Sequence, residues 1–190
     1  MLTSAEVTRA ELPRVTLTRL LERGEVTRVQ RGVYRLSRSS RAPTVDAERE
    51  ELLELQLRFP HARPCLVSAL HLHGLTTTRP VALQLAIPSN RQLRVAAPAV
   101  EVYYFAVRYY SEGVTELSVG DRRLLTYTTE KTLCDLLRYA PKIGRELYLE
   151  GLRKYLRRSA PSELIAQAKR LGIWQAMSRD VEVMLHDQDH

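Results

Sequence analysis

Six arginines crowd into residues 23–41 (RGEVTRVQRGVYRLSRSSR), a segment that contains only one acidic side chain. A two-residue turn at Arg31-Gly32 would fold it into a β-hairpin that sets Arg28 directly opposite Arg35. Like charges that face each other across paired strands destabilise a sheet. We therefore expect something outside the chain to compensate this charge, and a polyanion is the obvious candidate.

The same register predicts which hairpin side chains are buried. It pairs Gln30 with Val33 and gives one face to residues that are apolar enough to pack on a helix, namely Thr27, Val29, Tyr34 and Leu36. A primed turn prefers Asn or Gly at the position of Arg31, so a bulged register stays open and would change this pairing.

Two helical patterns precede the hairpin. Thr3-Ser-Ala-Glu6 fits a capping box, which predicts a short helix to about Ala10. Pro13 suits the first turn of a second helix, and Gly24 suits the position just past its end. The order of helix, helix and basic hairpin is that of a winged helix-turn-helix. Because such a domain normally has three helices, we expect that its first helix has been lost or lies before the given start.

The distribution of charge points to a ligand of this part of the chain. Residues 1–41 carry nine arginines and four glutamates, a net charge of +5, whereas the rest carries 20 basic and 18 acidic side chains. A basic excess in one segment indicates contact with nucleic acid or with an acidic membrane surface. The alternative is a solvated surface whose arginine stems cover the core. The candidate DNA-binding residues lie on the second helix and the hairpin: Arg14, Thr16, Thr18, Arg19, Arg23, Arg28, Arg31 and Arg35.

Residues 37–44 (SRSSRAPT) are polar and fit a linker. We therefore expect two domains, a winged helix-turn-helix over residues 1–41 and a mixed α/β domain over residues 45–190. Hydrophobic patterns in the second domain predict strands mostly before helices, which is an α+β arrangement. The predicted strands cover residues 81–87, 100–107, 114–119 and 122–127, and the predicted helices cover residues 46–59, 65–75, 129–139, 143–158, 162–171 and 174–186.

Three segments, in order along the chain, together resemble the AbiEi family, the antitoxins of type IV (abortive-infection) toxin–antitoxin systems. They are LTRLLERGEVTRVQRGVYRL, then CLVSALHLHGL with the strand LAIPSNR, and finally TYTTEKTLCDLLRY. The resemblance implies a DNA-binding N-terminal domain that represses the protein's own operon. It also implies a C-terminal domain that counteracts a nucleotidyltransferase toxin without a tight, permanent complex.

Lys131 and Asp135 belong to the third of these segments and lie four residues apart on a predicted helix. By spacing alone they fit a surface ion pair worth a few tenths of a kcal/mol. The resemblance to the AbiEi family implies a structural or antitoxin role for them instead.

Metal binding and catalysis find little support in the sequence. His71 and His73, with Cys65 and Cys134, match neither a CxxC nor an HxxxH spacing, so we expect no metal site. Two cysteines among apolar residues are expected to be reduced, buried thiols of an intracellular protein. The chain has no P-loop, no GxSxG elbow and no Glu-x-Lys on a predicted strand, so we expect neither an enzyme nor a cofactor.

Two tyrosine pairs, Tyr103-Tyr104 and Tyr109-Tyr110, flank Arg108 and could form a stacking platform. Because side chains alternate along a strand, we expect half of this cluster to belong to the core.

No apolar run approaches the ~18 residues that a membrane span needs, and we expect a cytoplasmic protein. The expected function is that of an antitoxin and autorepressor that binds double-stranded DNA at its own promoter and counteracts a nucleotidyltransferase toxin. The alternative is a winged-helix transcription factor whose C-terminal part senses a ligand or dimerises. The sequence leaves the operator and the oligomeric state open.

Overall fold

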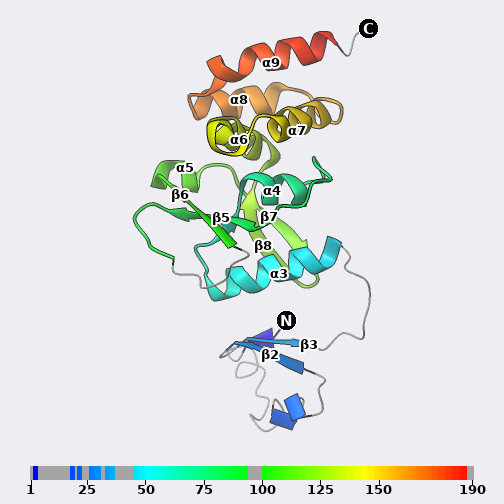
Figure 1. Ribbon diagram of the computed structural model, residues 1–190, viewed down its shortest axis with the longest axis vertical. Helices are drawn as coiled ribbons and strands as arrows, with labels where there is room; N and C mark the ends of the chain where they lie inside the picture. Colours follow the sequence, from blue (N-terminus) through cyan, green and yellow to red (C-terminus); the bar gives the residue numbers. More distant parts are fainter. Residues whose placement is uncertain are drawn as a thin grey trace. The chain divides into compact units, whose positions relative to one another are not determined.

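The computed structural model describes residues 2–3, 18–19, 21–22, 26–30, 33–36, 45–93 and 100–187. The chain divides into two compact units, Met1–Pro60 and His61–His190. Helices and strands mix in the predicted α+β manner, with every assigned strand before the last four helices (Figure 1). The first unit ends later than the expected boundary because it includes helix α3 (Val45–Arg58). The domain boundary at residues 41–45 remains a prediction.

The first unit contains a three-stranded antiparallel sheet in the order β1-β3-β2. Its strands are β1 (Leu2–Thr3), β2 (Val26–Gln30) and β3 (Val33–Leu36), and helix α3 (Val45–Arg58) follows. The second predicted helix is present where it is described, at residues 18–19 and 21–22. The first predicted helix lies outside the described residues from position 4 onward.

The hairpin register differs from the unbulged prediction at one residue. Gln30 faces Val33 as expected, but an irregularity between Arg28 and Gln30 makes Arg28 face Tyr34 instead of Arg35. The predicted pair of facing arginines is therefore wrong. One extra residue in β2 shifts the pairing by one position, and this bulge keeps the two like charges from opposing each other.

The bulge also changes which side chains of β2 share a face with Tyr34 and Leu36. Val26 and Val33 are buried, whereas Thr27 is exposed and Tyr34 is half-buried. The prediction that Thr27 shares a buried face is wrong, because a slip of one residue transfers a strand's side chains to the other face.

The second unit begins with a small mixed sheet in the order β4-β5-β6. Strand β4 (Arg63–Pro64) pairs antiparallel with β5 (Leu83–Pro88), and β5 pairs parallel with β6 (Val100–Phe105). All six residues of β5 are buried, which is typical of a strand that reads as a nearly continuous apolar run. Helix α4 (Leu66–Leu72) precedes β5 and packs against it.

A hairpin and four helices complete this unit. Strands β7 (Val114–Val119) and β8 (Arg122–Tyr127) pair antiparallel around a turn in which Gly120 has a φ of 62°. The helices are stacked at one end of the unit (Figure 1). They are α6 (Thr129–Ile143), α7 (Glu146–Leu156), α8 (Ser162–Arg170) and α9 (Trp174–His186). Helix α6 packs against α4, α7 and α8, which makes it the centre of the core.

Three short elements were not predicted, namely strands β1 and β4 and helix α5. The strand expected over residues 100–107 ends at Phe105, and helix α5 (Val107–Ser111) follows it. Strand β4 has only two residues. The tyrosines behave as predicted, since Tyr103 and Tyr110 are buried and their neighbours are not. None of the helices in the described ranges is long and apolar enough to cross a bilayer.

Candidate functional site

The structure describes three of the eight predicted DNA-binding side chains. Thr18 and Arg19, on the second predicted helix, and Arg28, on β2, are all exposed. The backbone of Arg35 lies in β3, but its side chain is not described. Four further candidates lie outside the described residues altogether: Arg14, Thr16, Arg23 and Arg31. Exposure is what side chains that contact DNA require, and these three residues meet that condition.

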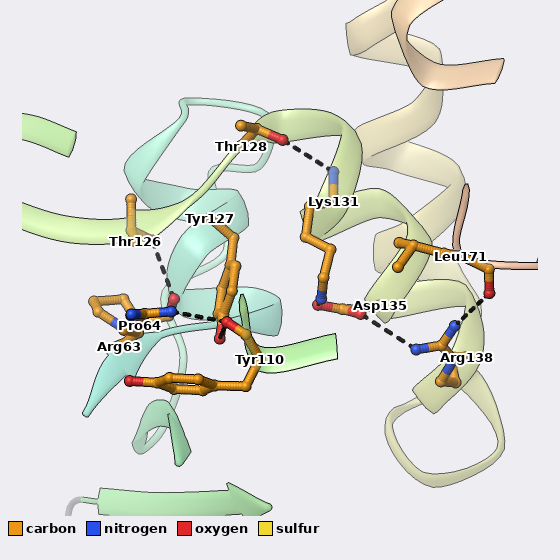
Figure 2. Close-up of polar contacts among 10 residues, drawn as sticks. All are labelled: Arg63, Pro64, Tyr110, Thr126, Tyr127, Thr128, Lys131, Asp135, Arg138 and Leu171. Atoms are coloured by element: carbon orange, nitrogen blue, oxygen red, sulfur yellow. Dashed lines mark hydrogen bonds and ion pairs between the residues drawn. The ribbon is translucent and has the colours of Figure 1, made fainter. Parts of the chain in front are cut away.

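Lys131 and Asp135 are almost completely buried, with exposed fractions of 0% and 1%. The Lys131 Nζ donates to Asp135 Oδ2 one turn further along α6 (Figure 2). The prediction of a surface ion pair is therefore wrong. Because both groups have lost contact with water, removal of either partner alone would leave an uncompensated charge in the core.

Two aromatic rings complete the surroundings of the Lys131 ammonium. Its Nζ lies 4.9 Å from the ring centre of Phe105 and 4.6 Å from that of Tyr127. The negative face of an aromatic ring attracts a cation, most strongly where water is excluded. Phe105 ends β6 and Tyr127 ends β8, so the two strand ends deliver the rings to α6.

Burial acts on the pKa of both members of the pair. It raises the pKa of Asp135 and lowers that of Lys131, while their mutual attraction acts in the opposite direction on each. Arg138 adds to the attraction on Asp135, since its NH1 lies 3.9 Å from Oδ1. The Arg138 guanidinium also donates to the Leu171 carbonyl at 3.1 Å, which fixes it between α6 and the end of α8 (Figure 2).

The start of α6 is fixed by a cap and by a close approach. Thr128 is the N-cap, and its Oγ1 accepts from the Lys131 backbone N–H at 3.3 Å. The Thr128 N–H in turn donates to the Gly113 carbonyl at 2.7 Å. Gly113 has a φ of 60°, and a Cβ there would lie only 2.6 Å from the Lys131 Cβ. Only glycine satisfies both conditions at position 113.

A second polar network fixes Tyr127 from the sheet side (Figure 2). The Tyr127 hydroxyl donates to the Tyr110 carbonyl at 3.1 Å, and Arg63 NH1 donates to the same oxygen at 2.7 Å. Thr126 Oγ1 donates to the Pro64 carbonyl at 3.0 Å. These bonds join β8 to β4 and α5, so the aromatic wall around Lys131 has little freedom to move. Sequence reasoning missed Arg63 because nothing near it in sequence marks it.

An open pocket of about 300 Å³ lies at the start of α6. Residues from the α5–β7 connection, α6 and α8 line it: Glu112, Gly113, Thr128, Glu130, Glu163, Gln167 and Arg170. Lys131 and Asp135 are not among the lining residues. Sequence reasoning missed this pocket because its residues come from three separate segments.

The cysteines and histidines play no shared role in the described part of the chain. Cys65 and Cys134 are buried free thiols, as predicted. Burial raises the pKa of Cys134 to about 12 and that of Cys65 well above its ordinary value, so neither is a reactive thiolate at neutral pH. His73 Nε2 lies 2.6 Å from the Tyr127 carbonyl. The described residues contain no group of three or more His, Cys, Asp or Glu that could hold a metal ion.

Comparison with known families gives one match, to residues 1–37, for a family described as "Transcriptional regulator, AbiEi antitoxin". No curated protein matches the chain. The matched residues include the predicted helices, the bulged hairpin and most of the basic excess, and they end before α3. The N-terminal fifth of the chain is therefore similar to AbiEi antitoxin regulators.

Proposed function

We propose that this protein is the antitoxin of a type IV toxin–antitoxin system, represses its own operon by binding promoter DNA, and counteracts a nucleotidyltransferase toxin. One observation carries the proposal: residues 1–37, the segment that matches the AbiEi regulator family, carry seven arginines and four glutamates, a net charge of +3. Family likeness and electrostatics thus point to the same residues by independent routes.

Residues 1–41 act as a winged helix-turn-helix in this proposal. Arginines of the second helix and the hairpin neutralise phosphates, which positions the domain on the duplex. Thr16, Thr18 and Arg19 contact base edges in the major groove, as residues of a recognition helix do. The exposure of Thr18, Arg19 and Arg28 supports these roles.

Residues 45–190 form the antitoxin domain. Lys131 and Asp135 contribute to it from inside, by fixing α6 against β6 and β8, and the toxin is counteracted without a stable complex. The protein acts in the cytoplasm by binding, without catalysis and without a cofactor.

One observation favours a second function. The open pocket at the start of α6 is large enough for a small ligand or a side chain. A winged-helix transcription factor whose C-terminal part senses a ligand would use such a pocket, and that protein would need no toxin.

Two measurements test the proposal. Mobility shifts with the promoter duplex should give a slope of log affinity against log salt of about −4 to −5 if four to six phosphates are neutralised. The Arg28→Ala variant should reduce the slope, whereas Arg153→Ala, an exposed arginine of α7, should leave it unchanged. Absence of DNA binding, or an affinity that does not change with salt concentration, contradicts autorepression.

The second measurement separates the two functions. The full chain is co-expressed with the product of a neighbouring nucleotidyltransferase gene, and growth is recorded. Rescue of growth supports the antitoxin, whereas DNA binding without rescue supports the transcription factor.

A further inference from the structure

We call the pocket at the start of α6 the acidic pocket. Its lining residues are Glu112, Gly113, Thr128, Glu130, Glu163, Gln167 and Arg170. Its three carboxylates outnumber its one guanidinium. Glu130 and Glu163 lie in the first turns of α6 and α8, where the positive end of a helix dipole stabilises a carboxylate. That effect explains Glu130 and Glu163 separately, but it does not explain why three glutamates line one opening.

Cations of the described residues do not neutralise these carboxylates. Within that part of the chain, Glu112, Glu130 and Glu163 form no ion pair. Arg170 donates from its NH2 to Gln167 Oε1. Figure 2 shows the side chain of Lys131 running away from Thr128 toward Asp135, so its ammonium is directed away from the start of α6. The lining is therefore net negative.

A neighbouring tyrosine reports the same negative field. The pKa of Tyr155 is raised first by burial, then by the charge of Glu130 and a hydrogen bond to its carboxylate, and then by the charge of Glu163. A phenolate is disfavoured there because two negative charges already lie close to it.

Gln167 adds an unpaired donor at the wall of the pocket. The side chain is 97% buried, and its Oε1 already accepts from Arg170, which fixes the orientation of the amide. The other end, Nε2, has no hydrogen-bond partner among the described residues. It lies beside Gly113, since a Cβ on that glycine would be 3.5 Å from it. A buried donor without an acceptor is costly, so a ligand that supplies an acceptor gains from meeting it.

These features select the ligand by its chemistry. Phosphates and nucleotides are repelled by the net negative lining, and the carboxylates of the described residues do not converge as metal ligands do. A guanidinium has five N–H donors in a planar fork and can engage more than one carboxylate at once. A volume of about 300 Å³ is at the lower limit for small-molecule sites and suits one long side chain.

We propose that the acidic pocket binds an arginine side chain of a partner polypeptide, with the guanidinium among Glu112, Glu130 and Glu163 and a main-chain carbonyl accepting from Gln167 Nε2. This site lies in the second unit and does not depend on DNA binding or on the identity of the toxin.

The test is a titration of the full ¹⁵N-labelled chain, followed by two-dimensional NMR. The probe is Nα-acetyl-L-arginine N-methylamide, which carries a guanidinium and two amide carbonyls. We expect it to shift the backbone amide of Gly113 and the side-chain amide of Gln167. The citrulline counterpart, which has the same shape without the charge, should bind at least about tenfold more weakly. N-Propylguanidine, which has the guanidinium without a carbonyl or a second charge, should also bind more weakly.

Substitutions locate the binding. Glu163→Gln should weaken binding of the arginine probe about two- to fivefold, the range of a partly exposed charge pair. Its matched control is Glu182→Gln, an exposed glutamate of α9 outside the pocket, which should bind as the parent chain does. Gln167→Met removes the donor at similar volume and should make N-propylguanidine and the arginine probe equivalent.

Three results overturn the proposal. The first is no shift of Gly113 or Gln167 with the arginine probe at high millimolar concentration, and the second is equal binding of the citrulline probe. The third is binding of N-propylguanidine as tight as that of the arginine probe to the parent chain, which would assign the pocket to a free guanidinium compound. Because Glu163 is exposed, its variant tests the charge contribution even if Gln167→Met does not fold.

Discussion

Arg28 on the hairpin and Lys131 on α6 are both cations that the sequence marks as notable, yet one is exposed and the other is completely buried. Arg28 faces Tyr34 across a bulged strand pair, and its charge lies at the surface. Lys131 has Asp135 as its partner and two aromatic rings around its ammonium. The difference shows that residue type alone does not determine whether a charged side chain contacts a ligand or contributes to the stability of the fold. Substitution of Arg28 should therefore alter DNA affinity, whereas substitution of Lys131 should alter stability.

A second ion pair, on α7, provides a reference for the buried pair. Glu150 and Lys154 on α7 have the same four-residue spacing as Lys131 and Asp135, and their charged groups are 2.7 Å apart. Their side chains are 33% and 30% exposed, however, so water remains in contact with both. Two ion pairs of equal spacing thus differ mainly in burial.

The largest expected effect is the separation of the two activities by truncation. A fragment of residues 45–190 should be soluble and still protect cells from the partner toxin, but it should lose DNA binding entirely. It contains all of the second unit, whose core is built from its own strands and helices. Growth of toxin-expressing cells and mobility shifts measure the two activities.

A shorter fragment, residues 61–190, shows whether α3 belongs to the antitoxin part. Two results together would show that neutralisation of the toxin depends on DNA binding. The soluble 45–190 fragment would fail to protect cells, and full-length variants that cannot bind DNA would fail as well.

Next in size is removal of one buried charge. Lys131→Met should reduce the free energy of unfolding by about 3–5 kcal/mol, because it leaves the Asp135 carboxylate buried without its partner. Lys154→Met on α7 is the matched control and should cost less than about 1 kcal/mol. Urea denaturation followed by circular dichroism measures both. If both variants lost the same unfolding free energy, burial would not explain the difference between the two ion pairs.

Replacement of both buried partners sharpens the same comparison. Lys131→Met combined with Asp135→Leu should recover most of the stability that the single variant loses, because apolar residues of similar volume often replace a buried ion pair without a penalty. The recovered stability is measured by the same denaturation, with the Lys131→Met chain as reference. A stable double variant that no longer protects against the toxin would give the pair a direct antitoxin role.

In the first unit, the effect of a substitution on DNA binding should depend on whether the residue contacts a base or a phosphate. Arg19→Ala should cost about 1–3 kcal/mol of binding free energy, mainly on the cognate operator. Arg28→Ala should weaken binding to all duplexes about equally and reduce the salt slope by about 1, as loss of a phosphate contact does. Neither should change stability by more than about 0.5 kcal/mol. A change of sequence preference in the Arg28 variant would reverse the assigned roles.

The smallest effect is the response of the exposed pair to acid. Hydrogen bonds from Lys154 and Thr76 lower the pKa of Glu150 below its ordinary value. Its contribution to stability is therefore complete above the unfolded-state pKa of about 4.5 and is lost as the pH falls through the lower folded-state value. Glu150→Gln should destabilise the chain by less than about 1 kcal/mol at pH 7 and not at all near pH 2. Denaturation at several pH values measures this, and a larger loss at low pH would contradict it.

Elements with strong local signals were predictable from the sequence. Helix α9 and the β7–β8 hairpin have the predicted boundaries, since apolar periodicity and a Gly-Asp turn are local properties. Helix α5 and strand β4 were missed because five and two residues carry too little pattern. The hairpin bulge was left open as an alternative, because a primed turn prefers Asn or Gly at the position of Arg31.

The candidate site was less predictable than the fold. The spacing of Lys131 and Asp135 indicated a pair, but their burial depends on Phe105 and Tyr127, which arrive from two other strands. No window of sequence contains those contacts. The acidic pocket has the same origin, because Glu112, Glu130 and Glu163 meet only after the chain has folded.

Gly113 belongs to both of the arrangements that this unit builds around α6. Its missing side chain lets the Lys131 Cβ approach, and the same residue forms part of the wall of the acidic pocket. A methyl group there would press on the core and narrow the pocket in a single step. Genetic screens for lost protection should therefore recover position 113 repeatedly, yet such alleles would not reveal which of the two arrangements had failed. Alleles at Glu163 and Lys131, taken together, would separate them.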